Sequence, residues 1–311
     1  MRCALALHSE NPEYVWRRIR AVSLEEISIA DLQLVAQVLA VAGKRSLQQK
    51  IGERALLSLL TARLATAPKC RTACDLLVWL PQAPKLVEDM QQPEFDAAAL
   101  LASEAAYLRH TAELWHSIAP RSIRTRSGWA VVSRGDARKR DAWLEEAGVP
   151  PLVRYIVERG SNTDALNVLL VPAYQLAQCG AQRLTSPSSS CTSLENIGGV
   201  PAYAYCIFSE PGRAALRRFL SANEKWRRLF DESGVHDPIR ALGYLAFYAE
   251  GGYCSEILSV SRSSEIKLLS EIASLERFGV PGGQVQNFQQ KMSADLPLLN
   301  ASRRATVGVK A

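Results

Sequence analysis

Apolar residues recur at helical spacing through most of the first 118 residues, and glycines and prolines divide them into separate segments. Leu32, Val35 and Leu39 lie on one face of such a segment, which Gly43 ends as a C-cap. A further helix is predicted from Ser46 to just before Pro68, and later segments end at Pro81 and Pro120 in the same way. We therefore expect a mainly α protein: an irregular helical array or α-solenoid-like bundle with minor β elements and an extended C-terminal tail.

Breaks in this pattern predict the division of the chain. The run TSPSSSCTSLENIGGV is polar and rich in serine, glycine and proline, so it reads as a flexible loop or subdomain boundary. The last 31 residues have little periodicity. The predicted parts are a helical-repeat-like N-terminal region (1–118), a basic loop or hairpin (119–135), a helical region (136–184), a flexible loop (185–200), a C-terminal helical region (201–280) and an extended tail (281–311).

Strands are predicted at only three places. Residues 129–133 are rich in β-branched side chains, and 201–208 alternate tyrosine with small residues. Residues 166–173 are apolar throughout, and Pro172 must kink or end any helix there, so helix and strand both stay open. Downstream, Asp237 followed by Pro238 predicts the start of a helix.

The positive charge of the chain is concentrated in one short stretch. Residues 121–140 hold seven basic residues and one acid, Asp136, so their formal charge of +6 equals that of the whole chain. Arginine pairs with phosphate and stacks on bases, and an aromatic ring beside it adds a stacking surface. Nucleic acid, an acidic protein partner and acids elsewhere in the chain all remain open as partners. The expected nucleic-acid contacts are Arg121, Arg124, Arg126, Trp129, Arg134, Arg138, Lys139 and Arg140.

Two further regions add basic residues. The segment 212–230 has apolar residues at the spacing of one buried helix face, with arginines and a lysine outside that face. A solvated amphipathic helix explains this segment as well as RNA contact does. The tail adds two adjacent arginines in a region expected to be extended. The contacts predicted from these regions are Arg213, Arg217, Arg227, Arg228, Arg303 and Arg304.

No arrangement of residues in the sequence matches a known catalytic or metal-binding pattern. There is no P-loop, no G-x-S-x-G and no H-E-x-x-H. The four histidines (His8, His110, His116 and His236) are scattered. Cys70 and Cys74 are one helical turn apart, but two small residues on a buried helix face explain them more simply. We predict no catalytic residues, no metal site, no cofactor and no small-molecule substrate.

The seven cysteines and the apolar runs bear on the compartment. No pair of cysteines stands as C-x-x-C, and free thiols fit a reducing compartment. No apolar run reaches the roughly 18 residues of a membrane span, so no transmembrane segment is expected. The N-terminus is rich in arginine but contains Glu10 and Glu13, which leaves open only a very short targeting presequence over about the first nine residues.

One segment carries a resemblance to a known family. Residues 30–43, ADLQLVAQVLAVAG, resemble the octotricopeptide and FAST-kinase-like helical repeats of organellar RNA metabolism. The resemblance covers about residues 20–115 and rests on apolar spacing. It implies an α-solenoid that binds RNA or packs within a ribonucleoprotein such as a mitochondrial ribosome. Several clean repeats and a terminal RNA-binding domain are missing from the sequence, so base-by-base reading is not implied.

These features together predict a non-enzymatic, RNA-associated scaffold. We expect a component, assembly factor or processing factor of an organellar ribosome or other ribonucleoprotein, with rRNA and neighbouring proteins as partners. The expected location is the mitochondrial matrix, or otherwise the cytoplasm. A divergent enzyme, such as a bacterial effector or transferase, and a helical subunit without RNA contact both stay open. A pocket with converging polar groups would favour an enzyme, and an open positive surface would favour the scaffold.

Overall fold

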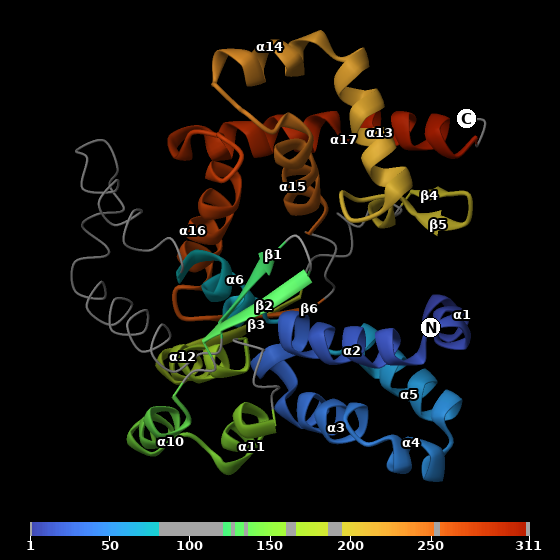
Figure 1. The fold of residues 1–311 in the computed structure, drawn as a ribbon. Helices are drawn as coiled ribbons and strands as arrows, with labels where there is room; N and C mark the ends of the chain where they lie inside the picture. The colour runs from blue at the N-terminus through green and yellow to red at the C-terminus, as the bar shows by residue number, and fades with distance from the viewer. Residues whose placement is uncertain are drawn as a thin grey trace. The chain divides into compact units, whose positions relative to one another are not determined.

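Helices dominate the structure, and its strands form only small antiparallel pairs (Figure 1). The prediction of a mainly α protein with minor β elements is therefore confirmed. The chain forms two compact units, of which unit 1 comprises Met1–Thr185 and Glu256–Lys267, and unit 2 comprises Ser186–Ser255 and Leu268–Ala311. The computed structural model describes residues 2–80, 121–125, 128–133, 136–159, 166–185, 195–251 and 256–308.

Unit 1 begins with a series of short helices. They are α1 (Arg2–Glu10), α2 (Pro12–Val22), α3 (Leu32–Ala42), α4 (Arg45–Ile51), α5 (Glu53–Thr66) and α6 (Thr72–Trp79). The carboxylate of Asp31 caps α3 by accepting a hydrogen bond from the Leu34 backbone, and Gly43 forms the predicted C-cap. The prediction of one helix from Ser46 to Pro68 is wrong, because Gly52 divides it. Its φ of 96° is a conformation that glycine adopts far more readily than other residues.

Three further helices complete the helical part of unit 1. They are α10 (Ala137–Glu146), α11 (Pro151–Arg159) and α12 (Leu166–Cys179), which share a buried cluster of aliphatic side chains. α11 also packs against α3, and α12 packs against α6. The alternative of a strand over 166–173 is wrong. Every residue from Leu166 to Ala173 is buried, so no polar face was present to reveal the helical period, and Pro172 is accommodated inside the helix.

A two-stranded sheet returns the chain to unit 1 after it has passed through unit 2. β3 (Ala181–Thr185) pairs antiparallel with β6 (Glu256–Val260), far along the sequence. The backbone of Leu258 donates to the carbonyl of Lys69 over 2.8 Å, so β6 is also fixed to the turn before α6. Unit 1 is thus built from two segments of the chain that are distant in sequence.

Unit 2 is a helical bundle with one tiny hairpin. The hairpin consists of β4 (Asn196–Ile197) and β5 (Val200–Pro201), and the helices are α13 (Glu210–Ala222), α14 (Glu224–Glu232), α15 (Pro238–Glu250), α16 (Ser263–Glu276, which starts in unit 1) and α17 (Val285–Val307). α17 packs against both α13 and α15. An aromatic cluster of Phe219, Trp226, Phe230 and Phe288 fills the core between α13, α14 and α17. Asp237 caps α15 through the Arg240 backbone, as predicted.

Two predictions for unit 2 are wrong. The tail over 281–311 is not extended, since most of it forms α17. Its inward positions do recur at helical spacing, but one of them is Arg303 and Pro297 interrupts the run, so the pattern was hidden. Residues 201–208 are not a strand either: after Pro201 the chain forms a single 3-10 turn and then an irregular segment.

Among the described residues, no single helix is both long enough and apolar enough to cross a membrane. One bent pair, Pro12–Ala42 with Arg45–Ile51, passes the same test by length and composition alone.

Candidate nucleic-acid interface

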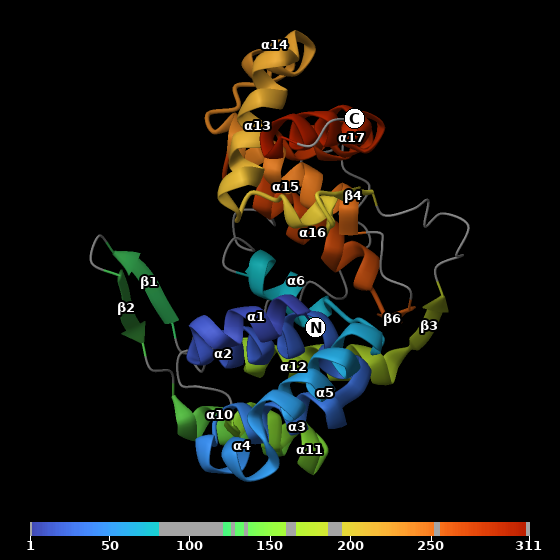
Figure 2. The same ribbon diagram turned by 90° about the vertical axis from the view of Figure 1, so that its right-hand side faces the viewer.

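The basic stretch forms the expected hairpin. β1 (Arg121–Thr125) pairs antiparallel with β2 (Gly128–Ser133) (Figure 2). The register sets Arg124 directly opposite Trp129. This confirms a strand over 129–133, and its partner β1 lies outside the three places where strands were predicted. Arg126 and Arg134 lie outside the described residues, as do the side chains of Arg121, Arg124 and Trp129.

The rest of the basic stretch forms the start of α10. The carboxylate of Asp136 caps this helix by accepting hydrogen bonds from the backbones of Arg138 and Lys139, over 3.0 and 3.1 Å. The side chains of Arg138 and Lys139 are exposed to solvent. Arg140 instead forms an ion pair with the neighbouring Asp141, over 3.0 Å. The described part of this stretch therefore offers two exposed cations rather than three.

The second predicted patch is divided in the same way. Arg213 donates to the carbonyl of Ile207 over 3.2 Å, and Arg227 donates to the last carbonyls of α13, including that of Leu220 over 3.0 Å. Arg228 pairs with Glu224 one turn earlier on α14, over 3.5 Å, with both side chains exposed. These three arginines thus have structural partners, although most of their hydrogen-bond donors stay available.

Three cations of this patch are exposed without a described partner. They are Arg217 and Arg218 on α13, and Lys225 on α14. Within the part of unit 2 that the structure describes, no acid lies at ion-pair distance from any of them. Arg217 is one of the predicted contacts, whereas Arg218 and Lys225 belong to the same basic run without having been predicted as contacts.

Arg303 is not a surface contact, and the prediction for this residue is corrected, whereas Arg304 is half-buried and ion-paired. Arg303 is 1% exposed and forms an ion pair with Glu250, which is itself 8% exposed. It also donates to the carbonyl of Tyr205 over 3.1 Å and to the side chain of Asn300 over 2.8 Å. Arg304 forms an ion pair with Glu195. Both arginines stabilise unit 2, because folding brings acids from distant positions to the face of α17.

Sequence reasoning missed one exposed aromatic residue. Phe208 is 70% exposed and stands at the end of the irregular segment that precedes α13. Its only described ring contact is an edge contact to Tyr244 of α15, with centroids 6.3 Å apart. The signal was present in the apolar run YAYCIF, but an alternating strand was the simpler interpretation of that run.

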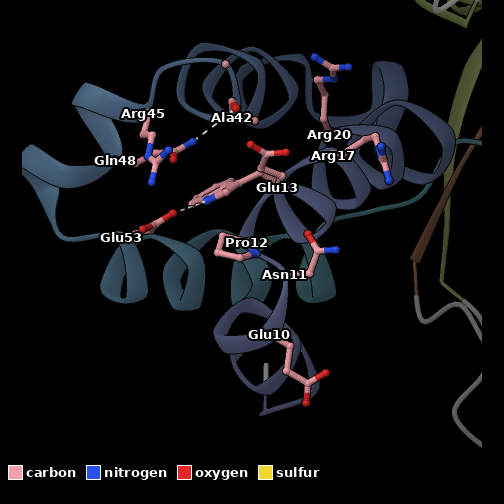
Figure 3. A pocket seen from close by; sticks show the side chains of 12 residues that line it. Glu10, Asn11, Pro12, Glu13, Arg17, Arg20, Ala42, Arg45, Gln48 and Glu53 are labelled. Atoms are coloured by element: carbon pink, nitrogen blue, oxygen red, sulfur yellow. Dashed lines mark hydrogen bonds between the residues drawn. The ribbon is translucent and has the colours of Figure 1, made fainter.

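A hollow in unit 1 has a different character. It has a volume of about 630 Å³ and lies where α4 meets the ends of α1, α2, α3 and α5 (Figure 3). Figure 3 shows Glu13 between Arg45 on one side and Arg17 and Arg20 on the other. Among the described residues, none of these four side chains pairs with another of the four. Cations and anions thus alternate around this hollow, and it is no simple anion site.

One carboxylate of the hollow, Glu53, has close polar contacts. Its Oε1 accepts a hydrogen bond from the indole of Trp16 over 2.9 Å, and Nε2 of His8 lies 3.0 Å from the same oxygen. The hydrogen bond from the Trp16 indole, and next the adjacent His8 imidazole, lower the pKa of Glu53 below its usual value. A general base works best with a pKa near the operating pH, so these contacts make Glu53 a poorer base rather than a better one.

The cysteines and histidines do not form a metal site within the described residues. No group of three His, Cys, Asp or Glu side chains there is placed to hold an ion. Burial raises the pKa of the Cys70 thiol, and burial also raises the pKa of Cys74 to about 12. Both thiols stay protonated at neutral pH and pack as small side chains. His110 and His116 lie outside the described residues.

Comparisons with protein-family models, with curated proteins and with solved structures found no match to this chain.

Proposed function

We propose that this protein is a non-enzymatic scaffold that binds RNA through an exposed basic surface. The observation that carries the proposal is a set of cations on α13 and α14 that are exposed and have no acid partner among the described residues: Arg217, Arg218 and Lys225. Exposed Arg138 and Lys139 on α10 add a second basic site in unit 1. This function requires two kinds of partner, RNA and the neighbouring proteins of a ribonucleoprotein. It requires no small-molecule substrate.

Phosphate is the ligand that fits these side chains best. An exposed cation stays solvated while it is free, so it loses little when no ligand is bound. On binding, each neutralised phosphate releases counterions, and the affinity then falls steeply with salt. Arginine supplies planar paired donors that match phosphate oxygens, which a point charge on lysine does not. A surface with arginine as its main cation therefore favours phosphate over a diffuse acidic partner.

The remainder of unit 2 suits a scaffold. Its helices are fixed by an aromatic core and by the buried pair of Arg303 and Glu250, so the basic helices are held in a constant geometry. The resemblance of residues 20–115 to organellar helical repeats suggests the setting. On that basis we propose an organellar ribosome or a related particle, with the mitochondrial matrix as its location.

The test is RNA binding by a double variant, Arg217→Gln with Arg218→Gln, over a series of salt concentrations. On a single strand, the slope of log K against log salt should fall by about 0.7 for each phosphate that the variant no longer neutralises. Lys44→Gln with Lys50→Gln is the matched control, because it removes two exposed charges from unit 1. An equal loss in both variants would mean that net charge, and no particular surface, drives binding. An absence of binding by the unaltered protein would refute the function.

The hollow in unit 1 favours a second function, the binding of a small ligand that carries both charges. Such a ligand would pair with Glu13 and with one of the flanking arginines, Arg20 or Arg45, which have no described ion-pair partner. An enzyme would use the same hollow. Thermal denaturation against a panel of zwitterionic metabolites tests this function, and Arg20→Ala should abolish any stabilisation that appears. If no member of the panel raises the melting temperature, the hollow is a solvated surface feature.

A further inference from the structure

The backbone of the segment before Phe208 is fixed by close contacts on both sides. Cys206 crosses the first turn of α13 so closely that a Cβ on Gly212 would lie 2.0 Å from its carbonyl oxygen. Ile207 is buried against α15, where a Cβ on Gly243 would lie 2.6 Å from the Cβ of Ile207. The segment therefore makes two close packing contacts, and each of them requires a glycine on the neighbouring helix.

Hydrogen bonds fix the same segment from two other directions. The buried guanidinium of Arg303 donates to the carbonyl of Tyr205 over 3.1 Å, and the hydroxyl of Tyr205 donates to the carbonyl of Ile197 over 3.0 Å. The next residue after buried Ile207 is Phe208, which points away from this anchored backbone and is 70% exposed. Exposing an apolar side chain of this size to water is unfavourable, and exposed apolar side chains often mark binding sites. A backbone fixed in a position that exposes Phe208 therefore suggests a function.

The surroundings of Phe208 are both aromatic and cationic. Tyr244 contacts its ring edge, and the row continues along α15 through Tyr248 and partly exposed Phe247. Arg213 donates to the carbonyl of Ile207, so its guanidinium lies beside the residue before Phe208. Arg217 follows one helical turn later on the same face of α13, about 6 Å away along the axis. The nearby acid, Glu210, lies in the first turn of α13, where the positive helix end offsets its charge.

We infer that Phe208 is a stacking platform for an unpaired base, and that the RNA bound by α13 is single-stranded. This inference rests on the proposed function. An aromatic ring next to arginines that follow the backbone is the arrangement by which proteins bind single strands without reading their sequence. A duplex hides the faces of its bases, so it can use the arginines but not Phe208. The competing possibility is that the exposed Phe208 side chain inserts into an apolar pocket of a protein partner.

The experiment measures the affinity of the full chain for a labelled oligouridylate and for a blunt RNA duplex. Phe208→Ala should weaken oligouridylate binding by about 5- to 150-fold and leave duplex binding unchanged. Phe208→Trp should keep the oligouridylate affinity, whereas Phe208→Leu should lose it despite a similar apolar size. Leu298→Ala is the control, because Leu298 is an exposed apolar residue of the same unit, on α17. Since Phe208 is exposed, the melting temperature of the variants should not change.

The outcomes separate this inference from the proposed function. If Arg217→Gln with Arg218→Gln weakens binding but Phe208→Ala does not, RNA binding stands and the stacking platform is wrong. Equal losses on single strand and duplex would also overturn the platform, since a duplex offers no free base. If Phe208→Ala keeps its RNA affinity but the ribonucleoprotein purified with this variant lacks a protein that the unaltered chain retains, Phe208 docks a protein instead. If the unaltered chain binds neither RNA, the proposed function itself fails.

Discussion

α13 and α17 each carry two adjacent arginines, and the two pairs have opposite roles. On α13, Arg217 and Arg218 are exposed and have no described acid partner. On α17, Arg303 is buried against Glu250 and Arg304 pairs with Glu195. In the sequence both pairs look alike. The difference arises from acids 53 and 109 residues away from the α17 arginines, which the fold brings to one helix and not to the other.

The largest effect expected from this comparison is on stability. Arg303→Met removes one partner of a buried ion pair and leaves the Glu250 carboxylate buried without its cation. Such a change costs about 3–5 kcal/mol, because an unpaired charge in the interior is poorly solvated. Urea denaturation should therefore show a strong loss in the free energy of unfolding.

A paired replacement controls this prediction. Arg303→Met with Glu250→Leu removes both charges, and it should recover much of the lost stability. If Arg303→Met alone unfolds no more easily than the unaltered protein, the α17 arginine is not structural, and the contrast between the two helices disappears.

The second effect on stability concerns the close packing of the Cys206 backbone against the first turn of α13. Gly212→Ala would place a Cβ 2.0 Å from the Cys206 carbonyl oxygen, which is backbone and cannot turn aside. The segment must shift, and we expect a cost of about 1–3 kcal/mol. Gly283→Ala is the control, because a Cβ at that position meets no atom within 4 Å. Equal stabilities of the two variants, measured by urea denaturation, would show that the segment before α13 is not held by this contact.

Local signals in the sequence predicted the helices well, because caps act over a few residues. Asp237 and Gly43 lie at the helix ends where the sequence predicted them. Signals failed where the cause was distant. The sequence does not indicate α17, because one of its inward residues is Arg303, whose partner lies on α15. The same holds for the site: the arginine patches were visible, but which arginines are free depends on contacts that only the fold defines.

Phe208 illustrates a further limit of sequence reasoning. Apolar residues in short runs are usually buried, and Ile207 beside it follows that rule. The two residues before Phe208 lie close to Gly212 and Gly243, and no local pattern predicts those contacts. The apolar run that contains Phe208 therefore did not indicate that this side chain is exposed.

A smaller effect is expected at the second arginine of α17. Arg304 and Glu195 are both partly exposed, so solvent screens their attraction. Arg304→Gln should lower the free energy of unfolding by less than about 1 kcal/mol. Arg303→Met should lower the free energy of unfolding several times more than Arg304→Gln. Comparing the two variants therefore separates the effect of burial from that of losing a charge. If the two variants are equally unstable in urea, burial does not set the strength of these ion pairs.

The smallest effect on stability is expected at α13, and it completes the comparison. Arg217→Gln with Arg218→Gln changes exposed side chains without described partners, so each substitution should alter the free energy of unfolding by no more than about 0.5 kcal/mol. The same variant should lose RNA affinity, whereas Arg304→Gln should lose neither RNA affinity nor much stability. Urea denaturation and salt-dependent RNA binding on the same samples measure both properties. If the α13 variant is clearly destabilised, its arginines are structural like those of α17, and the basic surface no longer supports an RNA contact.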